Sequence, residues 1–301
     1  MKQNRLGNSD IVVSEIGFGC MSLPLEDAQA AEAILCKALD LGVTFFDTAD
    51  LYGQGRNEAF VGRTFKSMRH QVVLATKVGN RWTPGQSGWT WDASKAYILR
   101  AVEDSLRRLQ TDYIDLYQLH GGTIEDSIDD VIEAFESLVQ SGKIRAYGIS
   151  SIRPNVIREY VRKSNIASVM MQYSLLDSRP EETILDLLQK NNISVIARGP
   201  VAGGRLSDKE TRGTEPYLDH SPETVARAQD LLSCLREGVP ASQVAIRFAL
   251  SHPAVATAIP GASREEQLVQ NVGAADISPL TPDERAQLAL QIPKIVYQLH
   301  R

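Results

Sequence analysis

Cysteine is scarce in this sequence, and the spacing of the cysteines argues against a domain held together by disulfides or by zinc. The 301-residue chain has only three cysteines, which lie far apart and form no CxxC pair: Cys20, Cys36 and Cys234. Neither a disulfide framework nor a zinc ribbon is therefore expected. The five histidines form no HExxH or HxH pattern, so we expect no protein-bound metal: His70, His120, His220, His252 and His300.

An excess of one charge and long apolar runs are also missing. The chain has 32 Lys and Arg residues against 37 Asp and Glu residues, without the concentrated positive charge of a nucleic-acid binder. No uncharged apolar run approaches the roughly 18 residues that a membrane span needs. Residues 1–5 lead into polar sequence and not into an apolar signal region. We expect a cytoplasmic protein without nucleic-acid or membrane partners.

The sequence does contain a regular alternation of β-rich and amphipathic segments. Eight short β-rich runs predict strands at Glu15–Gly19, Val43–Thr48, Val72–Lys77, Tyr113–His120, Ala146–Ser150, Ser168–Gln172, Ser194–Arg198 and Val255–Ile259. Between them, apolar residues recur every three or four positions and predict helices such as Ala28–Leu41, Ser94–Leu109, Ser127–Ser141, Pro180–Gln189 and Ser242–Leu250. Eight alternations predict an α/β fold, a (β/α)₈ TIM barrel that spans residues 1–301 as one domain.

An open doubly wound sheet is the rival fold, and its dinucleotide-binding fingerprint is absent. The one early candidate, residues 17–22, has Ser22 where the third glycine belongs. Before the first barrel strand, apolar residues flank an Asn-containing turn in Arg5–Val13, which predicts a short β-hairpin at the barrel floor. Helices are expected at the C-terminal end of the chain.

Two connections are longer than a barrel requires. Val78–Asp92 follows the third strand and carries all three tryptophans, and Val201–Pro222 follows the seventh strand and is rich in Gly, Ser, Thr and Asp. Long loops after barrel strands lie on the catalytic face, so we expect both to cover substrate and cofactor. Trp82, Trp89 and Trp91 either line a substrate pocket or hold their own loop in place, and the sequence favours neither.

Four polar residues stand at or just beyond the ends of three neighbouring strands. Asp47, Lys77 and His120 each end a predicted strand, and Tyr52 follows five residues after Asp47. Strand parity brings the first three to one barrel mouth if their faces point inward. Taken singly, each has an ordinary explanation as a helix cap, a solvent-reaching lysine, a hydrogen-bonded histidine or a packed tyrosine. Their coincidence at one end favours an active site.

Proton donation to a developing alkoxide is the chemistry that these residues suggest. A cation within hydrogen-bonding reach stabilises a phenolate, which makes a phenol a better acid. Lys77 is the expected cation beside Tyr52, with Asp47 holding it charged. His120 is expected to donate to a carbonyl oxygen and orient it. No side chain supplies a hydride, so a nicotinamide cofactor is required.

The sequence resembles the aldo-keto reductase superfamily over nearly its whole length, from Gly17 to Asn271. The most specific segments are FDTADLYG (46–53), ATK (75–77), GKIRAYGIS (142–150) and IPGAS (259–263). The resemblance is closest to bacterial reductases related to potassium-channel β subunits. It implies a (β/α)₈ barrel in which NADPH lies across the C-terminal face and passes a hydride to an aldehyde or ketone. It also implies that Asp47, Tyr52, Lys77 and His120 form the family tetrad, with Tyr52 as general acid and base.

The resemblance further implies the residues that contact the cofactor. Ser150, Ser151 and Gln172 are expected to hold the nicotinamide carboxamide. The helix start after the eighth strand suits a phosphate, although a Gly-rich turn there is also an ordinary connection. The full expected set is Ser150, Ser151, Gln172, Arg198, Gly199, Pro200, Gly203, Arg205, Gly261, Ser263, Arg264, Gln267, Gln270 and Asn271.

Three positions depart from the family pattern. Ser151 replaces a common Asn, which weakens one carboxamide contact. Arg198 stands where many members have an aromatic ring, so it either stacks on the nicotinamide or attracts an anionic substrate. Gly261 stands where some branches have a Lys for the 2′-phosphate. We expect Arg264 to bind that phosphate, with Arg205 in reserve, and hence NADPH with NADH as the lesser cofactor.

Two other functions compete with a carbonyl reductase. Relatives of this branch serve as cofactor-sensing channel subunits, but we expect no added interaction segment before the barrel. A metal-dependent lyase predicts clustered carboxylates and histidines at strand ends, and only Asp47 and His120 qualify. The expected partner is a small carbonyl substrate, and the protein is expected to be either a monomer or a homo-oligomer.

Overall fold

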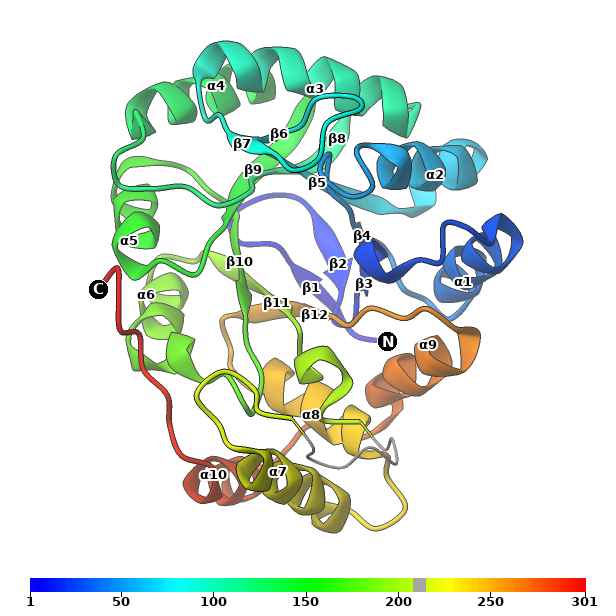
Figure 1. Ribbon diagram of the computed structural model, residues 1–301, viewed down its shortest axis with the longest axis vertical. Helices are drawn as coiled ribbons and strands as arrows, with labels where there is room; N and C mark the ends of the chain where they lie inside the picture. Colours follow the sequence, from blue (N-terminus) through cyan, green and yellow to red (C-terminus); the bar gives the residue numbers. More distant parts are fainter. Residues whose placement is uncertain (208–214) are drawn as a thin grey trace.

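Eight parallel strands form the central sheet of the computed structural model, which describes residues 1–207 and 215–301 (Figure 1). In spatial order they are β12 (Val255–Ile259), β11 (Ser194–Arg198), β10 (Ser168–Gln172), β9 (Ile144–Ser150), β8 (Ile114–Leu119), β5 (Val73–Val78), β4 (Phe45–Asp47) and β3 (Phe18–Gly19). All eight predicted strands are confirmed. The first two strands are shortened most, each by three residues; in the first, the sheet pairing begins at Phe18 and not at Glu15.

The sheet closes on itself through the residues just before β3. Ile16 forms a parallel bridge with Ala258 of β12. The Gly17 amide donates to the Ala258 carbonyl (2.9 Å), and the Ala258 amide donates to the Glu15 carbonyl (3.0 Å). These bonds join the first and last strands, so the sheet is a barrel. The predicted (β/α)₈ fold is confirmed, and the open doubly wound sheet is excluded.

Helices surround the barrel in Figure 1. They are α1 (Ala28–Asp40), α2 (Arg56–Phe65), α3 (Lys95–Leu109), α4 (Ile128–Gln140), α5 (Pro154–Lys163), α6 (Ile184–Lys190), α7 (Pro222–Leu235), α8 (Ala241–Leu250), α9 (Glu265–Val272) and the C-terminal α10 (Pro282–Gln291). Short 3₁₀ turns cover Cys20–Ser22, Lys66–Gln71, Arg179–Glu182, Ala202–Gly204 and Gly273–Asp276. Ser94 caps the N-terminus of α3, because its hydroxyl accepts a hydrogen bond from the Tyr97 amide (3.3 Å).

The predicted helix Pro180–Gln189 is wrong as a single element. The chain forms a 3₁₀ turn and then α6, separated at Thr183, whose backbone (φ −156°, ψ −21°) is not helical. Glu181 and Glu182 are held by distant partners, since Arg285 donates to Glu181 (2.8 Å) and Arg301 pairs with Glu182. Tertiary contacts of this kind outweigh local helix periodicity.

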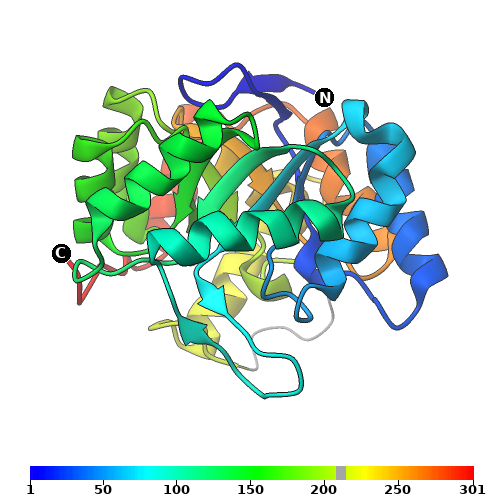
Figure 2. The ribbon, with the colours of Figure 1, turned by 90° about the horizontal axis from the view of Figure 1, so that it is seen from above.

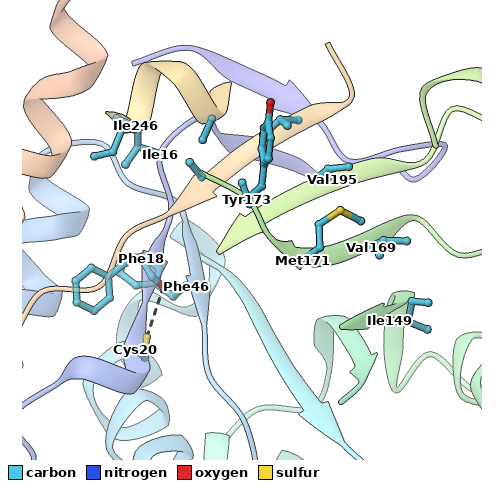
Figure 3. Packing of buried hydrophobic residues seen from close by; sticks show 14 of the residues in the cluster. Ile16, Phe18, Cys20, Phe46, Ile149, Val169, Met171, Tyr173, Val195 and Ile246 are labelled. Atoms are coloured by element: carbon cyan, nitrogen blue, oxygen red, sulfur yellow. Dashed lines mark hydrogen bonds between the residues drawn. The ribbon is translucent and has the colours of Figure 1, made fainter. Parts of the chain in front are cut away.

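Two apolar layers hold the barrel together. The outer layer lies between the strands and the helices, and Figure 3 shows part of it, including Phe18, Phe46 and Met171. The inner layer fills the barrel and combines side chains from several strands, among them Phe45 and Leu116. Because side chains alternate along a strand, neighbours such as Phe45 and Phe46 serve different layers.

The N-terminal hairpin is confirmed and plugs one end of the barrel. It consists of β1 (Gln3–Arg5) and β2 (Val12–Ser14), paired antiparallel. Leu6, Ile11 and Val13 are fully buried and belong to the inner apolar layer. Figure 2 shows this hairpin at one end of the molecule and the loop after β5 at the other. The barrel floor is therefore closed, and its opposite mouth is the place for a site.

The two long loops are only partly regular. The loop after β5 contains an unpredicted hairpin, β6 (Asn80–Arg81) with β7 (Thr90–Trp91). In the loop 201–222, residues 208–214 lie outside the described residues, so the expectation for that part stays a prediction. Among the described helices, none has the length and apolar character to cross a membrane.

Val13 and Val12 offer a matched test of the hairpin plug, since one is fully buried and the other is 49% exposed on the same strand. Val13→Ala removes two buried methyl groups and leaves a cavity, so we expect a loss of about 2 kcal/mol in unfolding free energy. Val12→Ala should change it by less than about 0.5 kcal/mol. Urea unfolding measures both. Equal losses in the two variants would contradict the plug.

Candidate active site

A buried lysine lies at the centre of the polar groups at the open mouth. The Lys77 ammonium donates to Asp47 Oδ2 (2.6 Å), to the Thr48 carbonyl (2.8 Å) and to the Tyr52 hydroxyl (3.4 Å). Lys77 is only 1% exposed. Its three donors are thus spent on a carboxylate, a backbone carbonyl and a phenol. The structure brings together Asp47, Tyr52 and Lys77 as the sequence predicts.

Strand parity explains how these side chains reach one place. Asp47 lies two residues after Phe45, and Lys77 lies two residues after Ala75; both apolar residues belong to the inner layer. Gln118, two residues after Leu116, donates to Asp47 Oδ1 (3.4 Å). The inner faces of β4, β5 and β8 therefore change from apolar to polar toward the open mouth.

The segment that carries Tyr52 is tied to its surroundings by buried hydrogen bonds. The Thr48 hydroxyl donates to Asn57 Oδ1 (2.6 Å), and the Asn57 amide side chain donates to the Cys20 carbonyl (2.8 Å). The Asn57 backbone amide donates to the Tyr52 carbonyl (3.3 Å). Tyr52 is consequently held over Lys77, which lies 5.0 Å from the centre of its ring.

The electrostatics of the ion pair follow from burial and proximity. Burial by itself lowers the pKa of Lys77, but the charge of Asp47 and the hydrogen bonds with Asp47 and Tyr52 outweigh it and raise that pKa. Burial raises the pKa of Asp47, and the charge of Lys77 is the largest opposing influence. The ammonium is thus held in its charged form inside a dry site.

His120 is kept neutral beside this pair. Burial, and then the charges of Lys77 and Arg198, lower the pKa of His120 to about 3. Its ring meets that of Tyr52 edge-on, with 5.9 Å between the ring centres. Its Nδ1 atom is buried and has no hydrogen-bond partner among the described residues. A neutral imidazole can donate one hydrogen bond at this mouth.

A cavity of about 980 Å³ connects the four residues with the expected cofactor contacts. Its lining includes Asp47, Tyr52, Lys77 and His120 together with Ser150, Ser151, Gln172, Arg198, Gly199, Pro200, Gly203, Gly261, Ser263, Arg264, Gln267, Gln270 and Asn271. Arg205 is not among the lining residues in the part of the chain described. Its guanidinium instead pairs with Glu215 (3.1 Å).

Another part of the cavity wall combines a tightly packed glycine with the start of a helix. A Cβ at Gly261 would lie 2.4 Å from the Ser22 hydroxyl, so a larger residue there would require the Ser22 side chain to move. The Asn271 side chain donates to the Gly261 carbonyl (3.3 Å), and Gln267 accepts from the Ser263 amide (3.0 Å). α9 begins beside them at Glu265, with its first backbone amides available for an anion. Volume and donor set both fit a nicotinamide dinucleotide.

Several lining residues were missed by sequence reasoning. Arg153 lies three residues after the end of β9, as the N-cap residue of α5, and its position beyond a strand end is a signal that could have found it. Tyr217 lies in an irregular loop, and Ser242 lies in the first turn of α8. Neither carries a local pattern, because only the tertiary fold brings them to the cavity. The remaining lining residues include Met21, Ile152 and Met170.

The tryptophans hold loops in place. Trp82 Nε1 donates to the Asp50 carbonyl (2.9 Å), and Trp91 Nε1 donates to Asp126 Oδ1 (2.8 Å). Trp89 is more than half exposed. None of the three lines the cavity within residues 1–207 and 215–301. For Trp82 and Trp91 the structure therefore favours the loop-holding alternative.

Comparison with known proteins decides the family. The model of the Aldo/keto reductase family matches residues 15–290. The chain belongs to this family. A relative from Bacillus subtilis, the uncharacterized oxidoreductase YqkF, is 52% identical over the full length of both chains. The aldo-keto reductase AKR11C1 from Bacillus halodurans, solved in a holo form, is 52% identical with a TM-score of 0.96, covering 100% of this chain and 99% of that chain.

A more distant aldo-keto reductase structure shares the fold. The glycerol dehydrogenase AKR11B4 from Gluconobacter oxydans is 27% identical, with a TM-score of 0.86 and coverage of 99% of this chain and 98% of that one. As an aldo-keto reductase, the present protein is an oxidoreductase that acts on carbonyl groups and uses a nicotinamide cofactor.

The lowered pKa of His120 predicts a specific loss of stability in acid. The folded-state value of about 3 lies below the ordinary 6.5, so the unfolded chain takes up this proton first as the pH falls. The stability that the protein gains by keeping this imidazole neutral is fully present above pH 6.5. It declines toward pH 3, by up to about 1.4 kcal/mol per pH unit.

Between pH 7 and pH 5, the unfolding free energy of the wild type should therefore fall by about 2 kcal/mol more than that of His120→Gln. Urea unfolding at both pH values measures this difference. His70→Gln, which removes an exposed imidazole, is the control and should behave as the wild type. Parallel losses in the wild type and His120→Gln would show that His120 is not held neutral.

Proposed function

We propose that this aldo-keto reductase is an NADPH-dependent carbonyl reductase, reversible as an alcohol dehydrogenase, with Tyr52 as its general acid. The observation that carries the proposal is the Tyr52 hydroxyl beside a buried Lys77–Asp47 ion pair, in a cavity large enough for a dinucleotide. A hydroxyl beside a fixed cation, with a neutral imidazole facing it, suits proton delivery to a carbonyl oxygen.

The cavity wall offers groups for each part of the cofactor. Ser150, Ser151 and Gln172 line the cavity at the ends of β9 and β10, which supports their proposed role in binding the nicotinamide carboxamide. Gly261 and Ser263 lie beside the start of α9 and suit the phosphates. The polar side chains of α9 suit the adenosine half: Gln267, Gln270 and Asn271. When bound, the nicotinamide supplies the hydride that reduces the carbonyl carbon.

The side chains around the carbonyl oxygen have separate roles in stabilising the negative charge that develops on it. Tyr52 donates its proton to the oxygen as negative charge develops there. Lys77 stabilises the resulting phenolate, and Asp47 keeps the ammonium charged and aimed at the phenol. His120, neutral at physiological pH, donates a hydrogen bond that orients the carbonyl. All of these dipoles and charges are in place before the reaction.

NADPH is the proposed cofactor because of Arg264. This exposed arginine is the N-cap residue of α9, next to the cavity region that suits the phosphates. Arginine binds phosphate through paired N–H donors and is the residue that accommodates a 2′-phosphate in other dinucleotide sites. Arg205, which pairs with Glu215 and is not among the cavity-lining residues of the described part of the chain, is the weaker candidate.

Tyr52→Phe tests the proton donor. Losing a general acid costs about 10²- to 10⁴-fold in rate, so kcat for NADPH-dependent aldehyde reduction should fall by at least about 100-fold. NADPH affinity, followed by intrinsic tryptophan fluorescence, should stay within about threefold because the substitution removes one hydroxyl only. Rates like those of the wild type would remove Tyr52 from the acid role. NADPH binding without turnover in the wild type would favour a cofactor-sensing function.

Arg264→Gln tests the preference for NADPH over NADH. Removing a phosphate-binding guanidinium should weaken NADPH binding about tenfold and leave NADH binding nearly unchanged. Arg227→Gln removes the same charge from the exposed face of α7 and should alter neither affinity. An equal loss for both cofactors in Arg264→Gln would assign Arg264 a role other than 2′-phosphate recognition.

A further inference from the structure

Both oxygens of the Asp47 carboxylate are held by a side-chain donor. The Lys77 ammonium donates to Oδ2 (2.6 Å), and the Gln118 side-chain amide donates to Oδ1 at the longer distance of 3.4 Å. Asp47 is buried, so little water reaches the carboxylate to replace either donor. The ammonium already has a place in the proposed reaction, whereas the amide of Gln118 has none.

The register of the sheet places Gln118 beside Lys77. The two residues are partners across the parallel strands β8 and β5. Gln118 lies two residues after Leu116, which belongs to the inner apolar layer, and two residues before His120. Because side chains alternate along a strand, Gln118 points into the barrel from the same face of β8 as Leu116. The strand that leads to His120 therefore also carries a donor to Asp47.

The orientation of the buried Gln118 amide is set by the carboxylate. An ionised carboxylate only accepts hydrogen bonds, so the NH₂ group of the amide faces it and the amide oxygen does not. Gln118 is fully buried, and its Oε1 atom has no hydrogen-bond partner among the residues that the structure describes. Packing alone does not account for this residue, because a methionine would fill a similar space without an unpaired buried oxygen.

The hydrogen bond from Gln118 helps to keep Asp47 ionised. Burial raises the pKa of Asp47, and four influences oppose it: the charge of Lys77, the hydrogen bond with Lys77, the hydrogen bond with Gln118 and the charge of Arg198. Without Gln118, Oδ1 would be a buried anionic oxygen without a donor, so Asp47 would take up a proton at a higher pH. A protonated Asp47 no longer supplies the negative charge that stabilises the Lys77 ammonium.

The other titratable groups around Asp47 do not supply this hydrogen bond. His120 is neutral, because burial and then the charges of Lys77 and Arg198 lower its pKa to about 3. Cys20 stays a thiol, because burial and then the charge of Asp47 raise its pKa. The Tyr52 hydroxyl contacts the ammonium on its other side (3.4 Å). Among the described side chains, only the ammonium and the amide of Gln118 donate to the carboxylate.

We propose that Gln118 is a positioning residue for the proton transfer, which holds the Asp47 carboxylate ionised and turned toward Lys77. The proposal rests on the carbonyl-reductase function above and adds a residue to it. Gln118 does not line the cavity in the part of the chain described, so it acts without touching substrate or cofactor. Its effect passes through hydrogen bonds in series, from the amide to Asp47, from Asp47 to Lys77, and from Lys77 to Tyr52.

A titration of the Asp47 carboxyl tests the proposal without turnover. The full-length protein is labelled with ¹³C at its aspartate carboxyls, and the Asp47 NMR signal is identified by its loss in Asp47→Asn. Gln118→Met keeps an unbranched side chain and removes the amide, so the midpoint should lie about one pH unit above that of the wild type. Gln229→Met is the control and should leave the midpoint unchanged. Gln229 is also buried with an unpartnered Oε1, but it donates to the Arg205 carbonyl (2.6 Å).

Two variants with opposite pH dependences test the same role in the reaction. For NADPH-dependent aldehyde reduction, kcat/KM should fall about tenfold in Gln118→Met near pH 7, and its decline in acid should begin at a higher pH than in the wild type. Gln118→Glu keeps the shape of the side chain, but its carboxyl donates to Asp47 only while it is protonated. The rate of this variant should therefore fall as the pH rises through the pKa of the new carboxyl, in a range where the wild-type rate is constant.

Two results would overturn the positioning role. The first is an Asp47 midpoint that is equal in the wild type and Gln118→Met, or no titration of Asp47 in either folded protein. The second is a loss of rate that is the same at every pH in both variants, because a purely structural defect does not move the acid limb. If Gln118→Met does not fold, Gln118→Glu decides by the direction of its pH dependence. If the wild type reduces no aldehyde, the reductase proposal fails, and the carboxyl titration decides on Gln118 by itself.

Discussion

The buried ion pair between Lys77 and Asp47 is the constraint on which the site depends. An ammonium that is 1% exposed stays charged only if a carboxylate and further acceptors replace the water that it has lost. Asp47 and the Thr48 carbonyl fill that role at 2.6 Å and 2.8 Å. The remaining contact of the ammonium, at 3.4 Å, is the Tyr52 hydroxyl. The groups that stabilise the buried ammonium therefore also orient it toward the phenol.

The barrel supplies the geometry for this pair through the alternation of side chains along parallel strands. Below the pair, inner-face residues such as Phe45 and Ala75 pack against the N-terminal hairpin. Nearer the open mouth, the same faces present Asp47, Lys77 and Gln118. One end of the barrel is therefore a closed apolar plug, while the other is a polar mouth with a cavity of about 980 Å³. The residues that stabilise the barrel and the residues of the candidate site therefore lie at opposite ends of the same strands.

Much of this arrangement follows from sequence patterns, because period-two alternation and strand ends are local properties. Asp47, Lys77 and His120 could be placed at one mouth for that reason. Features that depend on distant contacts could not be predicted, such as the break at Thr183 and the arrival of Tyr217 beside Gln172. The state of Arg198 belongs with them. Sequence left it between stacking on a nicotinamide and attracting an anion, and the structure adds only that its Nη1 atom donates to Gln172 Oε1 (3.0 Å).

A double-mutant cycle with Tyr52→Phe and Lys77→Met tests the central claim most directly, because it asks whether the phenol and the ammonium act as one unit. The measurement is kcat/KM for NADPH-dependent reduction of an aldehyde by the wild type, both single variants and the double variant. If Lys77 acts through Tyr52, the double variant should be hardly slower than the slower single variant. Rate losses that multiply in the double variant would show that the two residues act independently and would contradict the account.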